Sequence, residues 1–197
     1  QLHELCRDTQ VEGLAQARDG ADWVTLVGKV DKAARDVRLA LPEEMTRLAV
    51  HQISQHGAFL QAVGTLVSAL DELSGALTAQ AERSELLELC RTRSVKTGDF
   101  VRKWLALATG KEKTDDVLWV ETFGLSLQLH LTPLSVAEVF NKQREGTPRA
   151  WIFTSATLAV RQDFSYFAAR MGLTDAESKT WPSPFNYREN GLLYVPS

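Results

Sequence analysis

The fold is decided first by residues 59–77, which read FLQAVGTLVSALDELSGAL. Apolar side chains recur in this segment at steps of three and four residues, the spacing that places them along one stripe of an α-helix. They are Leu60, Val63, Leu66, Val67, Leu70, Leu73 and Leu77. A helix with such a stripe buries it against neighbouring helices, so the segment predicts one member of a helical bundle.

The preceding segment has the same period and recognisable ends. Asp22 is placed to cap a helix that contains Trp23 and Val37. This helix should stop near Leu41, because Pro42 disfavours helical geometry in the residue before it.

A further helix is expected after the segment 59–77. Ser84 is placed to begin it, with Leu86 among the inward residues. Gly98 should divide this helix from a second piece over residues 100–108, because glycine weakens a helix interior. No repeat of fixed period is visible. Residues 1–113 therefore predict four to six antiparallel helices, packed as a bundle or an elongated insert.

The sequence pattern changes after residue 113. Two strands are expected around Gly124, and the second alternates leucines with polar residues. The expected elements are strands over 117–122, 125–131 and 150–153 and helices over 136–144 and about 163–171. The strand over 150–153 is apolar throughout, which is typical of a strand buried on both faces. Residues 114–180 thus predict part of an α/β layered domain, and the whole chain an α+β fold that is mainly helical.

The composition is that of an ordinary globular protein. The chain has 197 residues, of which 44% are hydrophobic and 24% charged, and its net charge is −3. No apolar run approaches the roughly 20 residues that a membrane span needs. Cys6 and Cys90 form no CxxC pair, and the four histidines show no ligand spacing. We therefore expect reduced thiols, no metal site and a cytoplasmic protein.

Positive charge is concentrated in residues 91–113, which hold seven basic and two acidic residues. A basic stripe on an acidic body is suited to contact with a phosphate backbone. The candidate nucleic-acid-binding residues are Arg93, Lys96, Arg102 and Lys103. The alternative is a solvated helix face, the usual role of a charge run. Trp104 is expected in the core, and its alternative role is to stack on a base beside phosphate contacts.

A cluster of small hydroxyl residues follows the predicted strand 150–153. It consists of Thr154, Ser155, Ala156 and Thr157. In open α/β sheets ligands bind beyond the carboxyl ends of strands, where these hydroxyl groups would lie. They can donate and accept hydrogen bonds, and no His or acid is spaced to make Ser155 a nucleophile, so the chemistry suits a relay between sites. The alternative is an ordinary Ser/Thr-rich turn.

The segment around these hydroxyls resembles motif III of the DinG/XPD branch of superfamily 2 helicases. The likeness rests on Phe153-Thr154-Ser155-Ala156-Thr157-Leu158, on Asp163-Phe164 with Phe167-Ala168-Ala169-Arg170-Met171-Gly172-Leu173, on His130-Leu131-Thr132-Pro133-Leu134, on Ser183-Pro184-Phe185 and on Leu192-Leu193-Tyr194-Val195-Pro196. It covers roughly residues 117–197. The helical half matches only by position and character, because this family inserts a helical arch between motifs II and III.

The resemblance implies an ATP-dependent 5′→3′ DNA helicase of DNA repair or replication. Residues 1–113 would be the arch that helps to enclose single-stranded or forked DNA, 114–180 a partial first motor domain and 181–197 the start of the second. The residues of motif III, 154–157, would couple ATP hydrolysis to DNA movement. The implied cofactors are ATP and Mg²⁺, and many members hold a 4Fe-4S cluster through four cysteines upstream of motif II. An arch can also be a docking surface for replication or repair proteins, and no membrane is implied.

The departures from the family pattern limit what this chain does alone. No GxxxxGK[ST] phosphate loop and no Asp-Glu-Ala-His box is present, and the first residue is Gln1. We therefore expect an internal fragment that binds no cofactor by itself and neither hydrolyses ATP nor unwinds DNA. The competing hypothesis is a helical interaction or scaffold module without nucleotide chemistry.

Overall fold

The computed structural model describes residues 2–42, 46–146, 149–192 and 194–195. The chain divides into two compact units, Gln1–Leu134 and Ser135–Ser197. Leu193 and Pro196, which belong to the last segment of the helicase resemblance, lie outside the described residues. Within the described part, no helix is both long and apolar enough to cross a bilayer.

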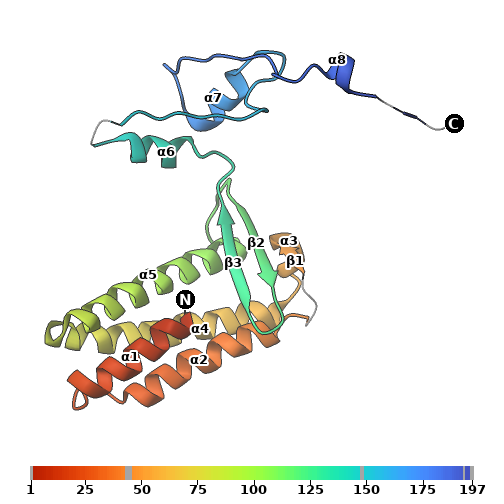
Figure 1. Cartoon of the computed structure of the whole chain (residues 1–197). Helices are drawn as coiled ribbons and strands as arrows, with labels where there is room; N and C mark the ends of the chain where they lie inside the picture. Colours follow the sequence, from red (N-terminus) through yellow and green to blue (C-terminus); the bar gives the residue numbers. More distant parts are fainter. Residues whose placement is uncertain (1, 43–45, 147–148, 193, 196–197) are drawn as a thin grey trace. The chain divides into compact units, whose positions relative to one another are not determined.

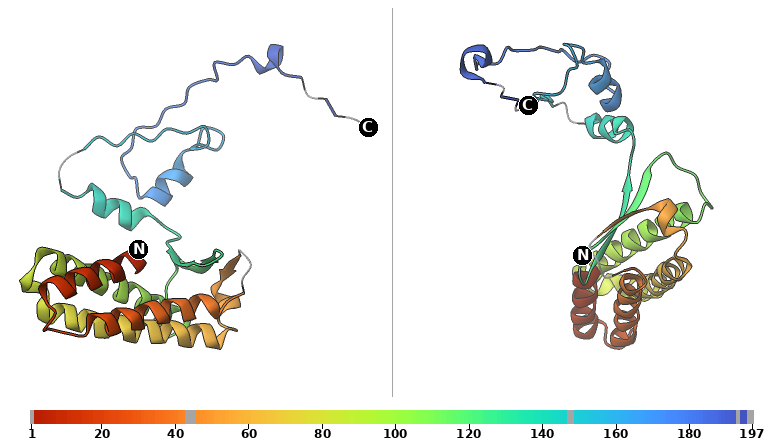
Figure 2. Two further views of the ribbon diagram at one scale, coloured as in Figure 1. Left: turned by 60° about the horizontal axis from the view of Figure 1, so that its bottom comes forward. Right: turned by 90° about the vertical axis from the view of Figure 1, so that its right-hand side faces the viewer.

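Four long helices form a bundle in the first unit (Figures 1 and 2). They are α1 (Leu2–Gln16), α2 (Trp23–Leu39), α4 (Gly57–Gln80) and α5 (Glu85–Ala108). Helix α4 packs against α2 and α5, and α1 packs against the same two helices. Two short elements, α3 (Val50–Ile53) and the 3-10 turn η1 (Ala81–Arg83), complete this helical part. The predicted bundle is thus confirmed.

The apolar stripe of residues 59–77 lies in the core of the bundle. Its buried members are Val63, Leu66, Leu70, Leu73 and Leu77, while Leu60 and Val67 are partly buried. Trp23 is buried beside them, and its indole N–H donates to the carbonyl oxygen of Ala17 at 2.7 Å. Gly13 permits the close approach of α1 to this ring, since a Cβ there would lie 2.5 Å from Trp23 Cδ2.

The predicted helix caps are present. Asp22 accepts a hydrogen bond from the backbone N–H of Thr25 at 3.1 Å, and α2 ends at Leu39, two residues before the predicted end. Ser84 begins α5, and its Oγ accepts from the backbone N–H groups of Leu86 and Leu87. Each side-chain oxygen satisfies helix N–H groups that have no partner within the helix.

Two predictions for α5 were wrong. The helix runs without a break through Gly98, because this residue is buried against α4, with Leu70 Cβ 3.7 Å from the position of an added Cβ. Packing across that close contact outweighs the cost of about 1 kcal/mol for glycine in a helix. Leu86 is exposed, because it lies one residue outside the inward stripe that contains Leu87 and Cys90.

A small antiparallel sheet packs on the bundle. Its strands are β1 (Arg47–Ala49), β2 (Val117–Thr122) and β3 (Leu127–Thr132), in the order β1-β2-β3. The side chains of Leu118 and Val120 point into the core, and Leu127, Leu129 and Leu131 pack against it. Leu125, predicted to begin the second strand, precedes it and is 98% exposed. The buried Arg38 of α2 holds the β2–β3 turn by donating from Nε to the carbonyl oxygen of Phe123 at 2.9 Å.

The second unit contains short helices and an aromatic cluster. The helices are α6 (Ala137–Arg144), α7 (Ser165–Met171) and α8 (Tyr187–Asn190). Gly172 ends α7 in the left-handed conformation, with φ +66°, as its position after the helix predicted. Phe140, on α6, packs edge-on against the rings of Trp151 and Phe153.

The predicted strand over residues 150–153 is absent. These residues belong to no strand, and Ile152 is 85% exposed rather than buried on both faces. A central strand needs neighbours on both edges to pair its backbone groups, and the described part of the second unit contains no strand. The α+β class is confirmed by the helices and the antiparallel sheet of the first unit, whereas the domain boundaries at 113/114 and 180/181 stay predictions.

Candidate functional site

The four residues Thr154–Thr157, here called the hydroxyl turn, are all exposed. Ser155 Oγ accepts a hydrogen bond from the backbone N–H of Thr157 at 3.2 Å and lies 3.2 Å from Thr157 Oγ1. Ser155 thus organises a local turn through its own side chain. Each hydroxyl group of the turn is neutral and can donate or accept a hydrogen bond, because its O–H rotates about the C–O bond.

The hydroxyl turn borders a large cavity of about 970 Å³ within the second unit. Thr154, Ser155 and Ala156 line it, whereas Thr157 does not. Its walls combine aromatic and charged side chains: Phe140, Trp151, Phe153, Phe164, Phe167 and Trp181 with Arg144, Arg149, Asp175, Glu177 and Lys179. A volume of this size lies at the upper end of the range for small-molecule sites.

Two features hold the hydroxyl turn in place. Before it, the ring of Phe153 packs edge-on against Phe140 and Phe167, each with its centroid 5.5 Å away. After it, Val160 and Asp163 exchange two backbone hydrogen bonds of 3.0 Å. Asp163 also accepts from the backbone N–H of Ser165 at 2.8 Å, and this bond lowers the pKa of its carboxyl. The turn is therefore framed by the aromatic contacts of Phe153 and by the start of α7, whose first N–H donates to Asp163.

In the part of the chain that the structure describes, the Ser155 hydroxyl lacks the surroundings of a nucleophile. Ser155 has its side-chain contacts with Thr157, and the hydrogen bonds of the described residues give it no His or carboxylate partner. A serine nucleophile needs such a base to remove its proton. The geometry supports the relay over a nucleophile.

The predicted basic stripe separates into two kinds of residue. Arg93 donates to Asp8 on α1 at 2.9 Å, and Arg102 donates to Asp99 at 2.7 Å and to Asp71 on α4. These guanidinium groups hold helices together, and their charge is largely balanced by the carboxylates. Arg93 is also the leading cause of the lowered pKa of Asp8.

Besides Arg102, Lys111 and Lys113, the stripe has two exposed cations, Lys96 and Lys103. Both lie on α5, and within the described ranges of the chain neither has a salt-bridge partner. Trp104 lies in the core as expected: its side chain is 0% exposed and its ring packs edge-on against Phe59, which excludes the alternative of stacking on a base. The exposed aromatic residue of the stripe is Phe100, which the sequence analysis did not single out, although it lies four residues after Lys96 and three before Lys103.

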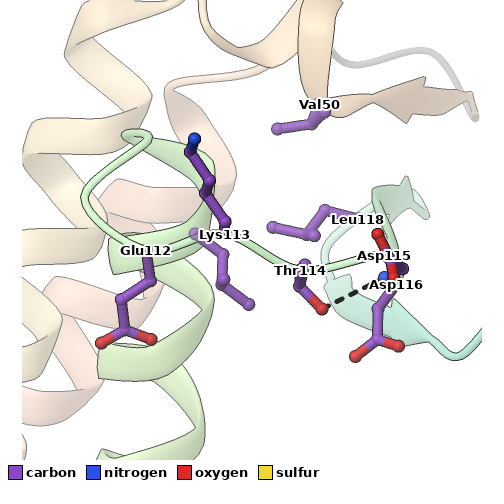
Figure 3. Close-up of a pocket in the computed structure, with 8 residues that line it drawn as sticks. Val50, Glu112, Lys113, Thr114, Asp115, Asp116 and Leu118 are labelled. Carbon is purple, nitrogen blue, oxygen red and sulfur yellow. Dashed lines mark hydrogen bonds between the residues drawn. The ribbon is translucent and has the colours of Figure 1, made fainter.

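A second depression, of about 510 Å³, lies where α5 leads into β2 (Figure 3). Its charged lining residues are Glu112, Lys113, Asp115 and Asp116, and Thr114 Oγ1 accepts from the backbone N–H of Asp116 at 3.1 Å. In the described part of the chain, no group of three or more His, Cys, Asp or Glu side chains is arranged to hold a metal ion. We assign no site to this depression.

Both cysteines lie inside the bundle. Burial, with a smaller contribution from the nearby Asp31, raises the pKa of the Cys6 thiol to about 12. Burial also raises the pKa of Cys90. Each side chain therefore acts as a small apolar core residue, because the nucleophile and metal ligand is the thiolate.

Comparison with known proteins found relatives along the whole chain. The sequence is 33% identical to the ATP-dependent DNA helicase YoaA of Haemophilus influenzae over 197 residues, all of this chain and 30% of the relative. It is 30% identical to the ATP-dependent DNA helicase YoaA of Escherichia coli over 195 residues, 99% of this chain and 30% of the relative. A probable ATP-dependent helicase of Bacillus subtilis, YpvA, is 27% identical over 129 residues, 66% of this chain and 20% of the relative.

The chain spans about 30% of the length of these YoaA relatives. No family model matches the sequence, and no solved structure matches the fold. The whole-chain matches include the helical half, where the motif resemblance held only by position. Along its whole length the chain is thus homologous to part of the ATP-dependent DNA helicases named YoaA, which are DinG-family proteins.

Proposed function

We propose that the chain is part of an ATP-dependent 5′→3′ DNA helicase that acts in DNA repair or replication. The observation that carries the proposal is the pair of whole-chain matches to proteins named ATP-dependent DNA helicase. The exposed hydroxyl turn beside the 970 Å³ cavity supports it, because motif III must reach neighbouring groups on the motor. A turn sealed within a finished core would have no such neighbours.

In this proposal the hydroxyl turn is motif III and couples the nucleotide state to DNA movement. Ser155 and Thr157 hydrogen-bond to each other here, and each can exchange that bond for one to a neighbouring group. Bonds formed in only one nucleotide state bias the motor toward one arrangement. Thr154 and Ala156 belong to the same turn, where the small Ala156 side chain lets other backbone come close.

The residues of this chain do not hold the helicase cofactors by themselves. The sequence has neither a phosphate loop nor an Asp-Glu-Ala-His box. ATP supplies the free energy and Mg²⁺ screens phosphate charge, and we assign the binding of both to other parts of the full-length helicase. The two buried cysteines, Cys6 and Cys90, cannot supply the four thiolates of a 4Fe-4S cluster, so any cluster would also lie elsewhere.

The bundle, residues 1–113, is the proposed arch that helps to enclose single-stranded or forked DNA. Its contacts to DNA would come from the exposed lysines on α5, because Arg93 and Arg102 are ion-paired within the bundle. The proposed boundaries are 1–113 for the arch, 114–180 for part of the first motor domain and 181–197 for the start of the second. The proposal also includes the docking of replication or repair proteins on the arch. It places the protein in the cytoplasm.

The test is an activity assay on the full-length gene product and on the 197-residue chain. We expect the full-length protein to hydrolyse ATP faster with single-stranded DNA and to displace a strand only from substrates with a 5′ single-stranded tail. The isolated chain should do neither, since it lacks the phosphate loop and the acidic box. A full-length protein without DNA-stimulated ATP hydrolysis would favour the alternative, a helical scaffold module without nucleotide chemistry.

A further inference from the structure

An exposed aromatic residue lies between the two exposed lysines of α5. Phe100 is 40% exposed, although most large apolar residues of the bundle helices face the core. Lys96 lies four residues before it and Lys103 three residues after it. Residues three and four apart on a helix are neighbours on one face, so the three side chains form a single strip. We call Lys96, Phe100 and Lys103 the lysine–aromatic strip.

The strip differs from the rest of α5 in its electrostatics. Arg91, Arg93 and Arg102 are each paired with carboxylates, and these pairs leave little free positive charge. Lys96 and Lys103 have no salt bridge within the described ranges, so their ammonium groups are available to an outside anion. Seven residues separate them, which is about 10.5 Å along a helix. Two cations at that spacing can contact different phosphates of one strand.

The combination favours a single nucleic-acid strand over other anionic partners. An exposed phenyl ring offers a face on which an unpaired base stacks, and stacking of this kind tolerates any base sequence. Lysines that flank the ring can contact the phosphates on either side of the stacked nucleotide. The bases of a duplex are already stacked on one another, so an aromatic platform of this kind serves an open strand.

We propose that the lysine–aromatic strip is a binding subsite for single-stranded DNA, in which Phe100 stacks on a base and Lys96 and Lys103 contact the flanking phosphates. The inference rests on the proposed helicase function and adds a residue, Phe100, and a mode of contact to it. Arg93 and Arg102 have a structural role in this inference: Arg93 holds α5 against α1, and Arg102 holds it against α4.

The test measures DNA binding by the full-length protein without nucleotide. The probes are a labelled oligodeoxythymidylate and a strand of the same length with abasic sites, which has phosphates but no bases. Phe100→Ala should bind oligodeoxythymidylate about tenfold more weakly and the abasic strand as the wild type does. Phe100→Leu, which keeps an apolar side chain without an aromatic face, should show the same loss, and Phe100→Tyr should restore binding.

The two lysines are tested by the salt dependence of DNA binding. The double variant Lys96→Gln/Lys103→Gln should bind both strands more weakly, and its slope of log K against log salt should fall by about 1.4 because two phosphate contacts are lost. The matched controls lie on α2: Leu39→Ala removes an exposed apolar side chain, and Lys32→Gln removes an exposed, ion-paired lysine. Both controls should bind as the wild type does.

The outcomes separate this inference from the proposed function. A full-length protein that binds no single-stranded DNA contradicts the helicase proposal itself. A protein that binds DNA normally when Phe100 is alanine or leucine overturns the stacking role alone, and the strip is then a protein-docking surface or a solvated face. An unchanged salt slope in the lysine double variant overturns the phosphate contacts.

Discussion

The indole N–H of Trp104 donates a hydrogen bond to the carbonyl oxygen of His130 at 3.0 Å, and this bond joins α5 to β3. Trp104 is fully buried, while the ring of His130 stacks on Trp119 on the outer face of the sheet, with centroids 3.7 Å apart. The bond thereby joins two residues 26 positions apart in the sequence. One lies in the helical half of the chain, and the other lies in the segment after residue 113 where strands were expected. The bond adds to the core packing of the strand side chains, and the hairpin belongs to the same compact unit as the bundle.

Trp104→Phe should loosen this junction. Phenylalanine has no N–H and is smaller than the buried indole, so we expect the 197-residue chain to lose about 2–3 kcal/mol of unfolding free energy in urea, from the lost hydrogen bond and the cavity together. Hydrogen exchange should accelerate at the amides of β3 more than in α2. Trp181→Phe, at an exposed position in the second unit, is the matched control and should change neither quantity. Equal exchange rates in β3 of wild type and Trp104→Phe would contradict the proposed role of the bond.

Gly13→Ala should destabilise the bundle, although alanine is the better helix former. An added Cβ would lie within 2.8 Å of three atoms of the buried Trp23 ring, and overpacking of this kind costs about 1–3 kcal/mol. Gly28→Ala on α2 is the control, since nothing lies within 4 Å of its added Cβ. We expect Gly28→Ala to stabilise the helix by up to about 1 kcal/mol. Thermal unfolding of both variants should therefore shift in opposite directions.

Cys6 should make stability fall at alkaline pH. Burial favours its neutral thiol and raises its pKa from 9.0 to about 12. The stabilisation from this group is therefore complete below pH 9 and is lost as the pH rises from 9 toward 12, because the unfolded chain releases the proton first. Cys6→Ala removes the effect, so its stability should depend less steeply on pH above 9. Urea unfolding at several pH values, with wild type and variant compared, tests this, and parallel curves would contradict it.

Arg93 and Lys96 should differ in their effect on stability. The hydrogen bond from Arg93 is the largest cause of the lowered pKa of Asp8, whose ordinary value is 3.8. This stabilisation is present above pH 3.8 and is lost as the pH falls further, when Asp8 takes up a proton. Arg93→Gln should thus be less stable than wild type at pH 7, with the difference shrinking below pH 4. Lys96→Gln, without an ion pair to lose, should match wild type across the range, as measured by urea unfolding.

The sequence predicts local features of this fold well. The spacing of apolar residues placed the helices, Asp22 and Ser84 cap helices as expected, and Gly172 ends α7. Each of these depends on residues close together in the chain. The unbroken α5 was missed because Gly98 is retained by packing against Leu70 on α4, a contact that local propensity does not contain.

The prediction of a strand over residues 150–153 was wrong for a related reason. The apolar pattern indicates which side chains prefer burial. A strand also needs neighbouring strands to pair its backbone groups, and the described part of the second unit contains no strand. The hydroxyl turn was identified from its residue types, and its exposure follows from the fold. Phe100 could have been found from its spacing to Lys96 and Lys103, whereas the ion pairs of Arg93 and Arg102 depend on which helices are neighbours.

In the proposed function the hydroxyl turn couples ATP hydrolysis to DNA movement. The most direct test compares the double variant Ser155→Ala/Thr157→Ala with wild type in the full-length protein and measures base pairs unwound per ATP hydrolysed. Ser126→Ala, which removes an exposed hydroxyl in the β2–β3 turn, is the matched control. We expect the double variant to bind DNA and hydrolyse ATP but to unwind at least about tenfold less per ATP, a loss of about 1.4 kcal/mol in coupling, and the control to match wild type. Unchanged unwinding per ATP in the double variant would contradict the claim.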